Sequence, residues 1–334
     1  MEIILIEISD NFSFKNKEKL CNLPLVTTIG TFDGFHNGHT KLINKVLYES
    51  KAKRYFSAVI TFDQSIKQFL ANSKKNYLFS FDTKKLIFQS FKIDYLIVFK
   101  VNKNLCNLQP KHFNKLLSNF FNIKEIIVGE DFCYGKNRTG NILTLRKNFK
   151  SISLKNLKYQ DKKLGTSTIK NLFKENKIEE TFELLRVPYF VNGNVVAGEK
   201  INKDYHTANI KHKNFKFFLN EGVYFGYSIY QKKIFPSMIY FALNEKNQTY
   251  LWETHLFNFS KDILEEKIFI IPVAFLRNKK IFKSEKEARA EIKKDYLLCK
   301  KKSKIFATNK KIHGSMKQLL KVLSFNEVLP ENNE

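Results

Sequence analysis

Short apolar segments alternate with amphipathic segments through the first half of the chain. Alternation of this kind predicts a parallel sheet covered by helices. Ligands of such sheets bind at the carboxyl ends of the strands, so the residues that follow each strand are the first candidates for function. The expected strands are Leu25–Gly30, Tyr55–Thr61, Asp94–Phe99 and Glu125–Gly129, and the expected helices are His39–Lys53, Thr83–Phe91, Pro110–Phe120, Ser167–Lys174 and Ile178–Leu185.

The pattern changes at Val187-Pro188-Tyr189, after which apolar runs follow one another without helices between them. Several short strands of this kind predict a small antiparallel barrel. We therefore expect a first domain over 1–186, a barrel domain over 187–300, and a basic then acidic tail over 301–334. The expected strands are Phe190–Ala197, Gly222–Tyr230, Ile239–Leu243, Tyr250–Phe259 and Lys267–Val273, and the expected helices are Ser284–Lys301 and one around Ser315–Leu323.

Length and cysteine usage narrow the class of protein. A chain of 334 residues fits two domains. The longest apolar run, Ile268–Leu276, contains Pro272 and is far shorter than the ~20 residues of a membrane span. The N-terminus is too short in apolar residues and too acidic for a secretory signal. The four cysteines are scattered without a Cys-x-x-Cys pair, which argues against a disulfide framework or a zinc site and favours the cytoplasm.

The formal net charge of +26 raises the question of nucleic-acid binding. Only six of the 58 basic residues are arginine, and the lysines are dispersed along the chain. Lysine, phenylalanine, isoleucine and asparagine all have AT-rich codons, so a biased genome accounts for the charge. A basic RNA-binding protein stays an alternative, but we expect the positive field mainly to attract small phosphate-bearing ligands.

The segment Thr31–His39 carries the sharpest chemical signal, because it follows a strand and opens a helix. Gly34 and Gly38 allow the backbone to approach a ligand closely. The helix N-terminus offers N–H groups to phosphate, and His36 and His39, three residues apart, face the same ligand. Such a site stabilises the charge that develops on phosphates and on departing pyrophosphate. The alternative is a glycine turn with two incidental histidines.

This segment resembles the His-x-Gly-His signature of nucleotidyltransferases, and Ile29–His39 as a whole is similar to bacterial bifunctional riboflavin kinase/FMN adenylyltransferases, the FAD synthetases. Further segments resemble that family in the same order, up to about residue 298. The resemblance implies a Rossmann-like nucleotidyltransferase domain with a parallel sheet, followed by a six-stranded antiparallel β-barrel of riboflavin-kinase type with a C-terminal helix. The further segments are Ile60–Phe62, Val128–Gly135, Gly165–Lys170, Leu184–Tyr189, His206–Asn209, Glu253–His255 and Phe275–Phe282.

For the first domain, the resemblance implies adenylyl transfer from ATP to FMN, with His36 and His39 as catalytic groups. From the residues alone, Asp131 is either a ligand-binding carboxylate or a solvated turn, and the hydroxyls that open the helix at Thr166 are either caps or phosphate ligands. The family has Arg where Lys170 stands, which changes a bidentate contact to a point charge. The implied ATP and phosphate ligands are Gly30, Phe32, Gly34, Gly38, Thr166, Ser167 and Lys170, and the implied flavin or nucleotide ligands are Asp33, Gly129, Asp131 and Gly135.

For the barrel, the resemblance implies ATP-dependent phosphorylation of riboflavin. Glu253 would take the proton of a primary hydroxyl as that oxygen attacks the γ-phosphate of ATP. Thr207 and Asn209 would hold Mg²⁺ through oxygen atoms, which Mg²⁺ prefers. Gly198 would lie at the phosphates and Arg277 at the flavin or nucleotide. From the residues alone, the favoured interpretation of Glu253 is a surface strand residue paired with a lysine.

The chain departs from the family pattern at three places. The family has Phe-Glu-Pro-His-Pro where this chain has Phe62–Ile66, its kinase loop is longer and richer in glycine than Gly198–Asn209, and its Asn-Ile-Gly-x-Arg-Pro-Thr segment has no clear counterpart in Met238–Asn247. We therefore keep two enzyme alternatives. One is a monofunctional FMN adenylyltransferase with an inactive kinase-like barrel, and the other is a nucleotidyltransferase with a different acceptor.

The expected partners are the small molecules riboflavin, FMN and ATP, with FAD as product and Mg²⁺ as the metal of both steps. Neither nucleic acid nor a membrane is expected as a partner. The sequence leaves the oligomeric state open.

Overall fold

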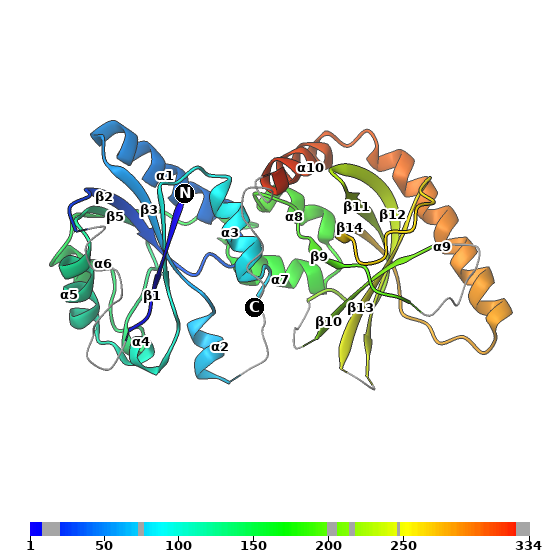
Figure 1. The fold of residues 1–334 in the computed structure, drawn as a ribbon, viewed down its shortest axis with the longest axis horizontal. Helices are drawn as coiled ribbons and strands as arrows, with labels where there is room; N and C mark the ends of the chain where they lie inside the picture. Colours follow the sequence, from blue (N-terminus) through cyan, green and yellow to red (C-terminus); the bar gives the residue numbers. More distant parts are fainter. Residues whose placement is uncertain (9–20, 73–76, 199–205, 214–217, 246–247, 325–334) are drawn as a thin grey trace. The chain divides into compact units, whose positions relative to one another are not determined.

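The computed structural model describes residues 1–8, 21–72, 77–198, 206–213, 218–245 and 248–324 (Figure 1). It divides into two compact units, the first built from most of residues 1–166 and the second from residues 167–324. Helix α8 (Ile178–Leu184) is counted with the second unit because it contacts β14 (Lys267–Asn278). The domain boundary after residue 186 stays a prediction, since the ends of a compact unit and of a functional domain need not coincide.

The first unit is built on a six-stranded sheet in which every neighbouring pair runs parallel, as the alternation predicted. Its central strands are nearly continuous runs of apolar and β-branched residues, which is typical of strands buried on both faces. The first and last strands in the chain order were not predicted. The strands are β1 (Glu2–Ile6), β2 (Leu25–Ile29), β3 (Phe56–Phe62), β4 (Tyr95–Phe99), β5 (Ile123–Gly129) and β6 (Ser151–Leu154), and they lie in the order β1-β4-β3-β2-β5-β6.

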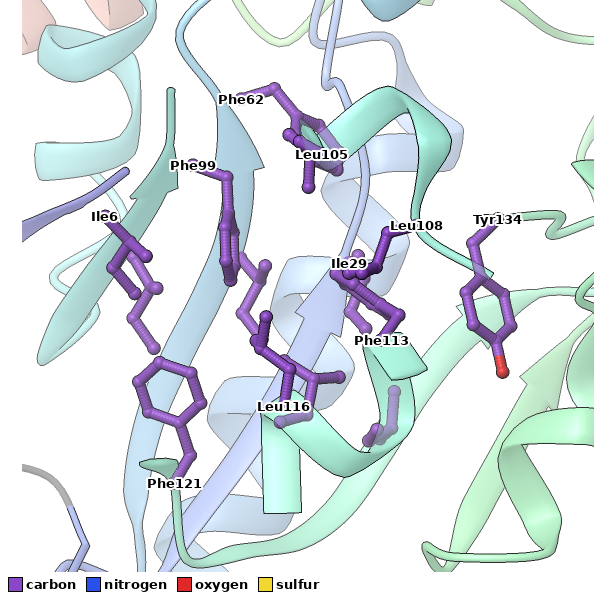
Figure 2. Packing of buried hydrophobic residues seen from close by; sticks show 14 of the residues in the cluster. Ile6, Ile29, Phe62, Phe99, Leu105, Leu108, Phe113, Leu116, Phe121 and Tyr134 are labelled. Atoms are coloured by element: carbon purple, nitrogen blue, oxygen red, sulfur yellow. The ribbon is translucent and has the colours of Figure 1, made fainter. Parts of the chain in front are cut away.

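Helices cover both faces of this sheet. On one face α1 (Asn37–Lys53) contacts β2, β3 and β5, and its Val46 packs with Val26 and Ile127. Side chains of a strand alternate between faces, so Ile29 belongs to the opposite face. There a larger apolar cluster forms beneath two further helices, as Figure 2 shows. These helices are α4 (Lys103–Asn107) and α5 (Pro110–Phe120).

The chain direction through the sheet defines where a ligand binds. From β2 the chain proceeds outward through β3 and β4, and it then returns to the other side of β2 with β5 and β6. The carboxyl ends of β2 and β5 therefore border a topological switch point, the usual ligand site of an open α/β sheet. The remaining elements of the first unit are α2 (Ile66–Leu70), α3 (Phe81–Gln89), η1 (Lys136–Arg138), α6 (Ile142–Arg146), β7 (Lys158–Tyr159) and β8 (Lys162–Lys163).

The second unit is a nearly closed antiparallel barrel, which confirms the predicted fold class. A single bridge between Val196 and Asn209 brings the two edges of its sheet together. Trp252, Phe241 and Tyr224 are fully buried and fill its core. Its strands are β9 (Val191–Asn194), β10 (Ala208–Lys213), β11 (Gly222–Tyr230), β12 (Lys233–Asn244), β13 (Thr249–Leu256) and β14, in the order β10-β13-β12-β11-β14-β9.

Helices complete the second unit. The predicted charged helix is α9 (Glu285–Phe306), which contacts β11 and β12, and α7 (Thr166–Lys174) precedes α8. Part of the segment expected as a tail forms α10 (Lys310–Leu323), whose apolar face packs on α8. In the part of the chain described here, no helix is long and apolar enough to cross a membrane.

Candidate active sites

The loop that follows β2 is anchored by its own aromatic side chains. Phe32 and Phe35 are buried, and both rings contact Phe88 of α3 edge-on, at centroid distances of 5.4 and 4.8 Å. Both residues have a positive φ, 49° and 42°, and so does Gly34 between them. Left-handed backbone at non-glycine residues costs energy and persists only where the surroundings hold it. The aromatic packing thus fixes the backbone of the predicted phosphate loop before any ligand binds.

His36 and His39 lie where the sequence predicted, at the start of α1. His36 is the N-cap residue of the helix, and its side chain does not cap the first turn. The two imidazole rings stack with centroids 3.7 Å apart. A Cβ atom at Gly38 would lie 2.9 Å from Nδ1 of His36, so only glycine at this position leaves room for the stacked pair.

Both imidazoles are neutral at pH 7. Burial, and then the charge of Lys163, lowers the pKa of His36 to about 4. Burial, His36 and two lysines lower the pKa of His39 well below its usual value. The Nδ1 atom of each ring is buried without a hydrogen-bond partner among the described residues. A neutral imidazole has one N–H donor and one acceptor, so the pair can donate to phosphate oxygens without carrying charge.

Asp131 follows β5, on the other side of the switch point. Its carboxylate pairs with Lys163 of β8, and both side chains are about half exposed. Burial alone would raise the pKa of Asp131, but hydrogen bonds from Lys163 and Asn156 and the charge of Lys163 bring it below its usual value. Because Lys163 also acts on His36, the structure brings the loops after β2 and β5 into one electrostatic neighbourhood. Sequence reasoning missed Lys163, which nothing distinguishes from the neighbouring lysines of this hairpin.

The other predicted residues of the first domain are distributed over the same edge and the start of α7. Gly30 approaches the ring of Phe32, and the main-chain oxygen of Asp33 accepts a hydrogen bond from the hydroxyl of Thr166. Gly129 ends β5, and Gly135 has a φ of 72° and lies against Pro110.

Ser167 and Lys170 belong to the second unit, where the ammonium of Lys170 lies 4.4 Å from the centroid of the Phe218 ring. Their phosphate-binding role stays a prediction.

The segment that replaces the family's Phe-Glu-Pro-His-Pro is held by local hydrogen bonds. Asp63 accepts from the backbone N–H of Val101 at 2.9 Å, and Ser65 caps α2 by accepting from the backbone N–H of Gln68. These side chains organise the loop after β3. Nearby, the buried Lys84 of α3 donates to the main-chain oxygens of Thr31 and Phe62.

In the barrel, three candidate side chains lie on one register row. Asn209 of β10 is opposite Glu253 of β13, and Glu253 is opposite Tyr240 of β12. The row continues through Val223 of β11 to Arg277 of β14. Register partners on neighbouring strands place their side chains on the same face of a sheet. The structure therefore makes Asn209 and Glu253 neighbours, and it places Arg277 in the same row three strands beyond Glu253.

Asn209 fits a metal ligand. It is 4% exposed, and its Oδ1 atom is buried without a hydrogen-bond partner among the described residues. Burying an amide oxygen in this way is costly unless a ligand satisfies it. A Cβ atom at Gly198 would lie 2.2 Å from Nδ2 of Asn209, so this glycine makes room for the amide. Thr207 is exposed just ahead of β10. Most of the shortened kinase loop, residues 199–205, lies outside the described residues.

The Glu-Thr-His segment of β13 has a structural role beside the chemical one. Thr254 is fully buried, and its hydroxyl hydrogen-bonds to Ser228 inside the barrel at 2.8 Å. His255 lies with Nδ1 2.9 Å from the main-chain oxygen of His206, so its Nδ1–H donates there. The two neighbours of Glu253 thus fix its strand and the segment that carries Thr207.

Arg277 is held by a carboxylate of the chain itself. Its guanidinium donates to Asp295 of α9 through Nε, at 2.9 Å, and through Nη2, and its Nη1 donates to the main-chain oxygen of Asn278. Asp295 is buried, so the pair ties α9 to β14. The predicted flavin or nucleotide contact of Arg277 stays a prediction beside this structural one.

Comparison with known proteins shows the family to which the chain belongs. A family model described as FAD synthetase matches residues 18–171, and one described as riboflavin kinase matches residues 185–303. A bifunctional riboflavin kinase/FMN adenylyltransferase of Buchnera aphidicola subsp. Schizaphis graminum is 34% identical over 299 residues, which cover 85% of this chain and 95% of that protein. The chain belongs to this bifunctional family.

A second member of the bifunctional riboflavin kinase/FMN adenylyltransferase family, from Bacillus subtilis, is 26% identical and covers 81% of this chain and 90% of its own. A crystal structure described as a macrolide-efflux protein from Streptococcus pneumoniae has a TM-score of 0.76 at 20% identity, over 89% of this chain and 99% of that one. This likeness supports the fold. Family, fold class and enzyme class are therefore confirmed: the chain is a bifunctional enzyme of FAD synthesis.

Proposed function

We propose that the two units divide the two reactions of FAD synthesis between them, with the residues at their sites in the roles given below. The barrel converts riboflavin and ATP to FMN and ADP. The first unit converts FMN and ATP to FAD and pyrophosphate. The observation that supports this division most directly is the stacked, neutral His36–His39 pair at the start of α1.

In the first unit, a phosphate oxygen of FMN attacks the α-phosphorus of ATP. The new phosphorus–oxygen bond forms as the bond to the β-phosphate oxygen breaks, and pyrophosphate leaves with the electron pair. His36 and His39 donate N–H groups to the phosphates as charge develops on them, in a site fixed before the substrates arrive. The first turn of α1 adds backbone N–H groups. Lys163 offers a positive charge that Asp131 holds in place until a phosphate competes for it.

In the barrel, Glu253 accepts the proton of the riboflavin 5′-hydroxyl as its oxygen attacks the γ-phosphorus of ATP, and ADP leaves. Asn209, its register partner, would hold Mg²⁺ through the buried Oδ1 atom, together with Thr207. A bound Mg²⁺ neutralises charge on the ATP phosphates. Gly198 keeps the space beside the Asn209 amide open.

Product analysis tests this function. The purified enzyme is given riboflavin, and separately FMN, each with Mg²⁺ and ATP, and the flavins are separated by chromatography. We expect FMN and FAD from riboflavin, and FAD and pyrophosphate from FMN. Formation of FAD from FMN without any conversion of riboflavin would replace the bifunctional assignment with a monofunctional FMN adenylyltransferase.

Riboflavin, FMN and ATP are the partners we assign to this chain, and we assign no nucleic acid, since the lysines are dispersed along the chain. A cytoplasmic location stays a prediction from the scattered cysteines.

A further inference from the structure

Lys84 alone is buried among the lysines that the structure describes, with 7% of its surface exposed. It lies in the first turn of α3, on the helix face that it shares with the buried Ile87 and Phe88. Phe88 is the residue on which Phe32 and Phe35 of the phosphate loop pack. A buried ammonium is expensive unless its surroundings supply hydrogen bonds.

The Lys84 ammonium joins the carboxyl ends of two neighbouring strands. Nζ donates to the main-chain oxygen of Thr31, just after β2, and to that of Phe62, the last residue of β3, each at 3.3 Å. An ammonium has three N–H donors, and the described residues accept two of them. These bonds hold the ammonium at the carboxyl ends of β2 and β3, the edge at which ligands of such sheets bind.

Charged groups reach Lys84 from each element packed around it. Burial lowers the pKa of Lys84 to about 8, and the carboxylates of Asp33, after β2, and Asp63, after β3, oppose this decrease. His39 of α1 also interacts with Lys84, because the positive charge of Lys84 contributes to lowering the His39 pKa. The ring of Phe81 lies 5.5 Å from Nζ.

We propose that Lys84 is a positioning residue for adenylyl transfer, which ties the phosphate loop to the end of β3 and keeps a positive charge beside the two histidines. The inference rests on the proposed function of the first unit. The ligand that benefits is the polyphosphate of a nucleotide, whose negative charge the buried ammonium attracts. Without the charge, Thr31 and Phe62 lose a shared donor, and the loop that carries His36 loses one of its attachments.

Three variants test this proposal, with the riboflavin kinase of the same chain as an internal control for folding. Lys84→Met removes the charge, Lys84→Arg keeps it, and Lys85→Met is the matched control at a partly exposed neighbour that pairs with Asp82. For Lys84→Met we expect kcat/KM for ATP in FAD formation to decrease roughly 10- to 100-fold, the scale of a lost charged hydrogen bond. Riboflavin phosphorylation, and both activities of Lys85→Met, should be unchanged.

A pH profile separates positioning through charge from mere packing. The kcat/KM of the wild type for ATP should fall as the pH rises through about 8, where Lys84 loses its proton. Lys84→Arg should retain at least part of the activity that Lys84→Met loses, and its alkaline limb should move beyond pH 9. Such a profile also decides the matter if Lys84→Met fails to fold.

The proposal is overturned if Lys84→Met forms FAD at the wild-type rate, or if Lys84→Arg keeps the wild-type alkaline limb. A wild-type enzyme that forms no FAD from FMN would instead overturn the proposed function itself.

Discussion

The two proposed sites of this enzyme are built by different means. In the first unit the proposed catalytic residues lie in loops and at a helix start, where a buried aromatic cluster and left-handed residues fix the backbone. In the barrel, Asn209, Glu253 and Arg277 lie on strands, and the register of the sheet alone places them in one row. The first site depends on the packing of a few side chains, whereas the second depends on strand pairing.

The electrostatics of the sites differ in the same way. Burial holds the two histidines of the first unit neutral, so that site offers hydrogen bonds and relies on surrounding lysines for charge. In the barrel the useful groups are a half-buried carboxylate and a buried amide oxygen that lacks a partner among the described residues. The first arrangement suits transfer of a charged nucleotidyl group, and the second suits deprotonation of a neutral alcohol beside a cation.

The largest effect should come from Glu253→Gln, which leaves the barrel surface intact but removes the base. We expect riboflavin phosphorylation to decrease roughly 10²- to 10⁴-fold, the usual contribution of a general base. FAD formation from supplied FMN should continue, because that site lies in the other unit. Flavin chromatography measures both, with Glu266→Gln, an exposed carboxylate ahead of β14, as the control. Undiminished FMN formation would show that Glu253 is a surface residue only.

His39→Ala should impair the other reaction, adenylyl transfer, and leave the kinase active. Removing one preorganised donor should lower FAD formation from FMN at least ~10²-fold, while riboflavin phosphorylation survives. His112→Ala, an exposed histidine of α5, is the matched control. Pyrophosphate release reports the rate. If His39→Ala keeps the wild-type rate, the histidine pair is incidental to the glycine turn, and the assignment of adenylyl transfer to this loop fails.

Gly38→Ala tests the stacked pair without removing a functional group. The added Cβ atom meets Nδ1 of His36 at 2.9 Å, so the ring must move. We expect roughly a tenfold slower FAD formation from this displacement alone. Gly314→Ala in α10, where the added atom meets nothing within 4 Å, should leave the rate unchanged. Equal rates for the two variants would mean that the position of His36 is not critical.

The smallest effect concerns the protonation state of His36, which should not change over the range in which an ordinary histidine titrates. In nitrogen-detected spectra of the free enzyme, the His36 imidazole should stay neutral from pH 8 down to pH 5, since its pKa is about 4. The unfolded chain binds this proton near pH 6.5, so the free energy of unfolding should decrease as the pH falls from 6.5 to 4. His36→Gln assigns the signal. Titration of His36 near pH 6.5 would contradict the burial of the pair.

Sequence patterns predicted the parallel sheet because its central strands are long apolar runs between amphipathic helices. Pro110–Phe120 and Gly222–Tyr230 were predicted with the bounds that the structure has. The edge strand Glu2–Ile6 was missed, because this run was judged only as a possible signal. Strand Ala208–Lys213 ends in three consecutive basic residues and lacks the apolar run that marked the other strands.

The candidate site was only partly predictable for a physical reason. The motif of His36 and His39 is local in sequence, so its spacing reveals it. The register row from Asn209 to Arg277 and the contacts of Lys163 and Lys84 arise from tertiary pairing, which local spacing does not encode. The sequence does contain one weak indication that Lys84 is buried. It lies three residues before Ile87 and four before Phe88, which places it on the apolar face of α3.

Helix α10 has a practical consequence for anyone who divides the chain to obtain the kinase alone. It lies beyond the segment that the riboflavin kinase model matches, and α8, on which it packs, lies in the gap between the two matched segments. Lys311 pairs with Glu183, and Ser315 donates to the main-chain oxygen of Phe182. A fragment of residues 185–303 would lack both α8 and α10 and would expose the face of β14 that α8 contacts. A fragment of residues 167–324 keeps α8 and α10 packed together. We expect this fragment, and not the shorter one, to stay monodisperse at high concentration.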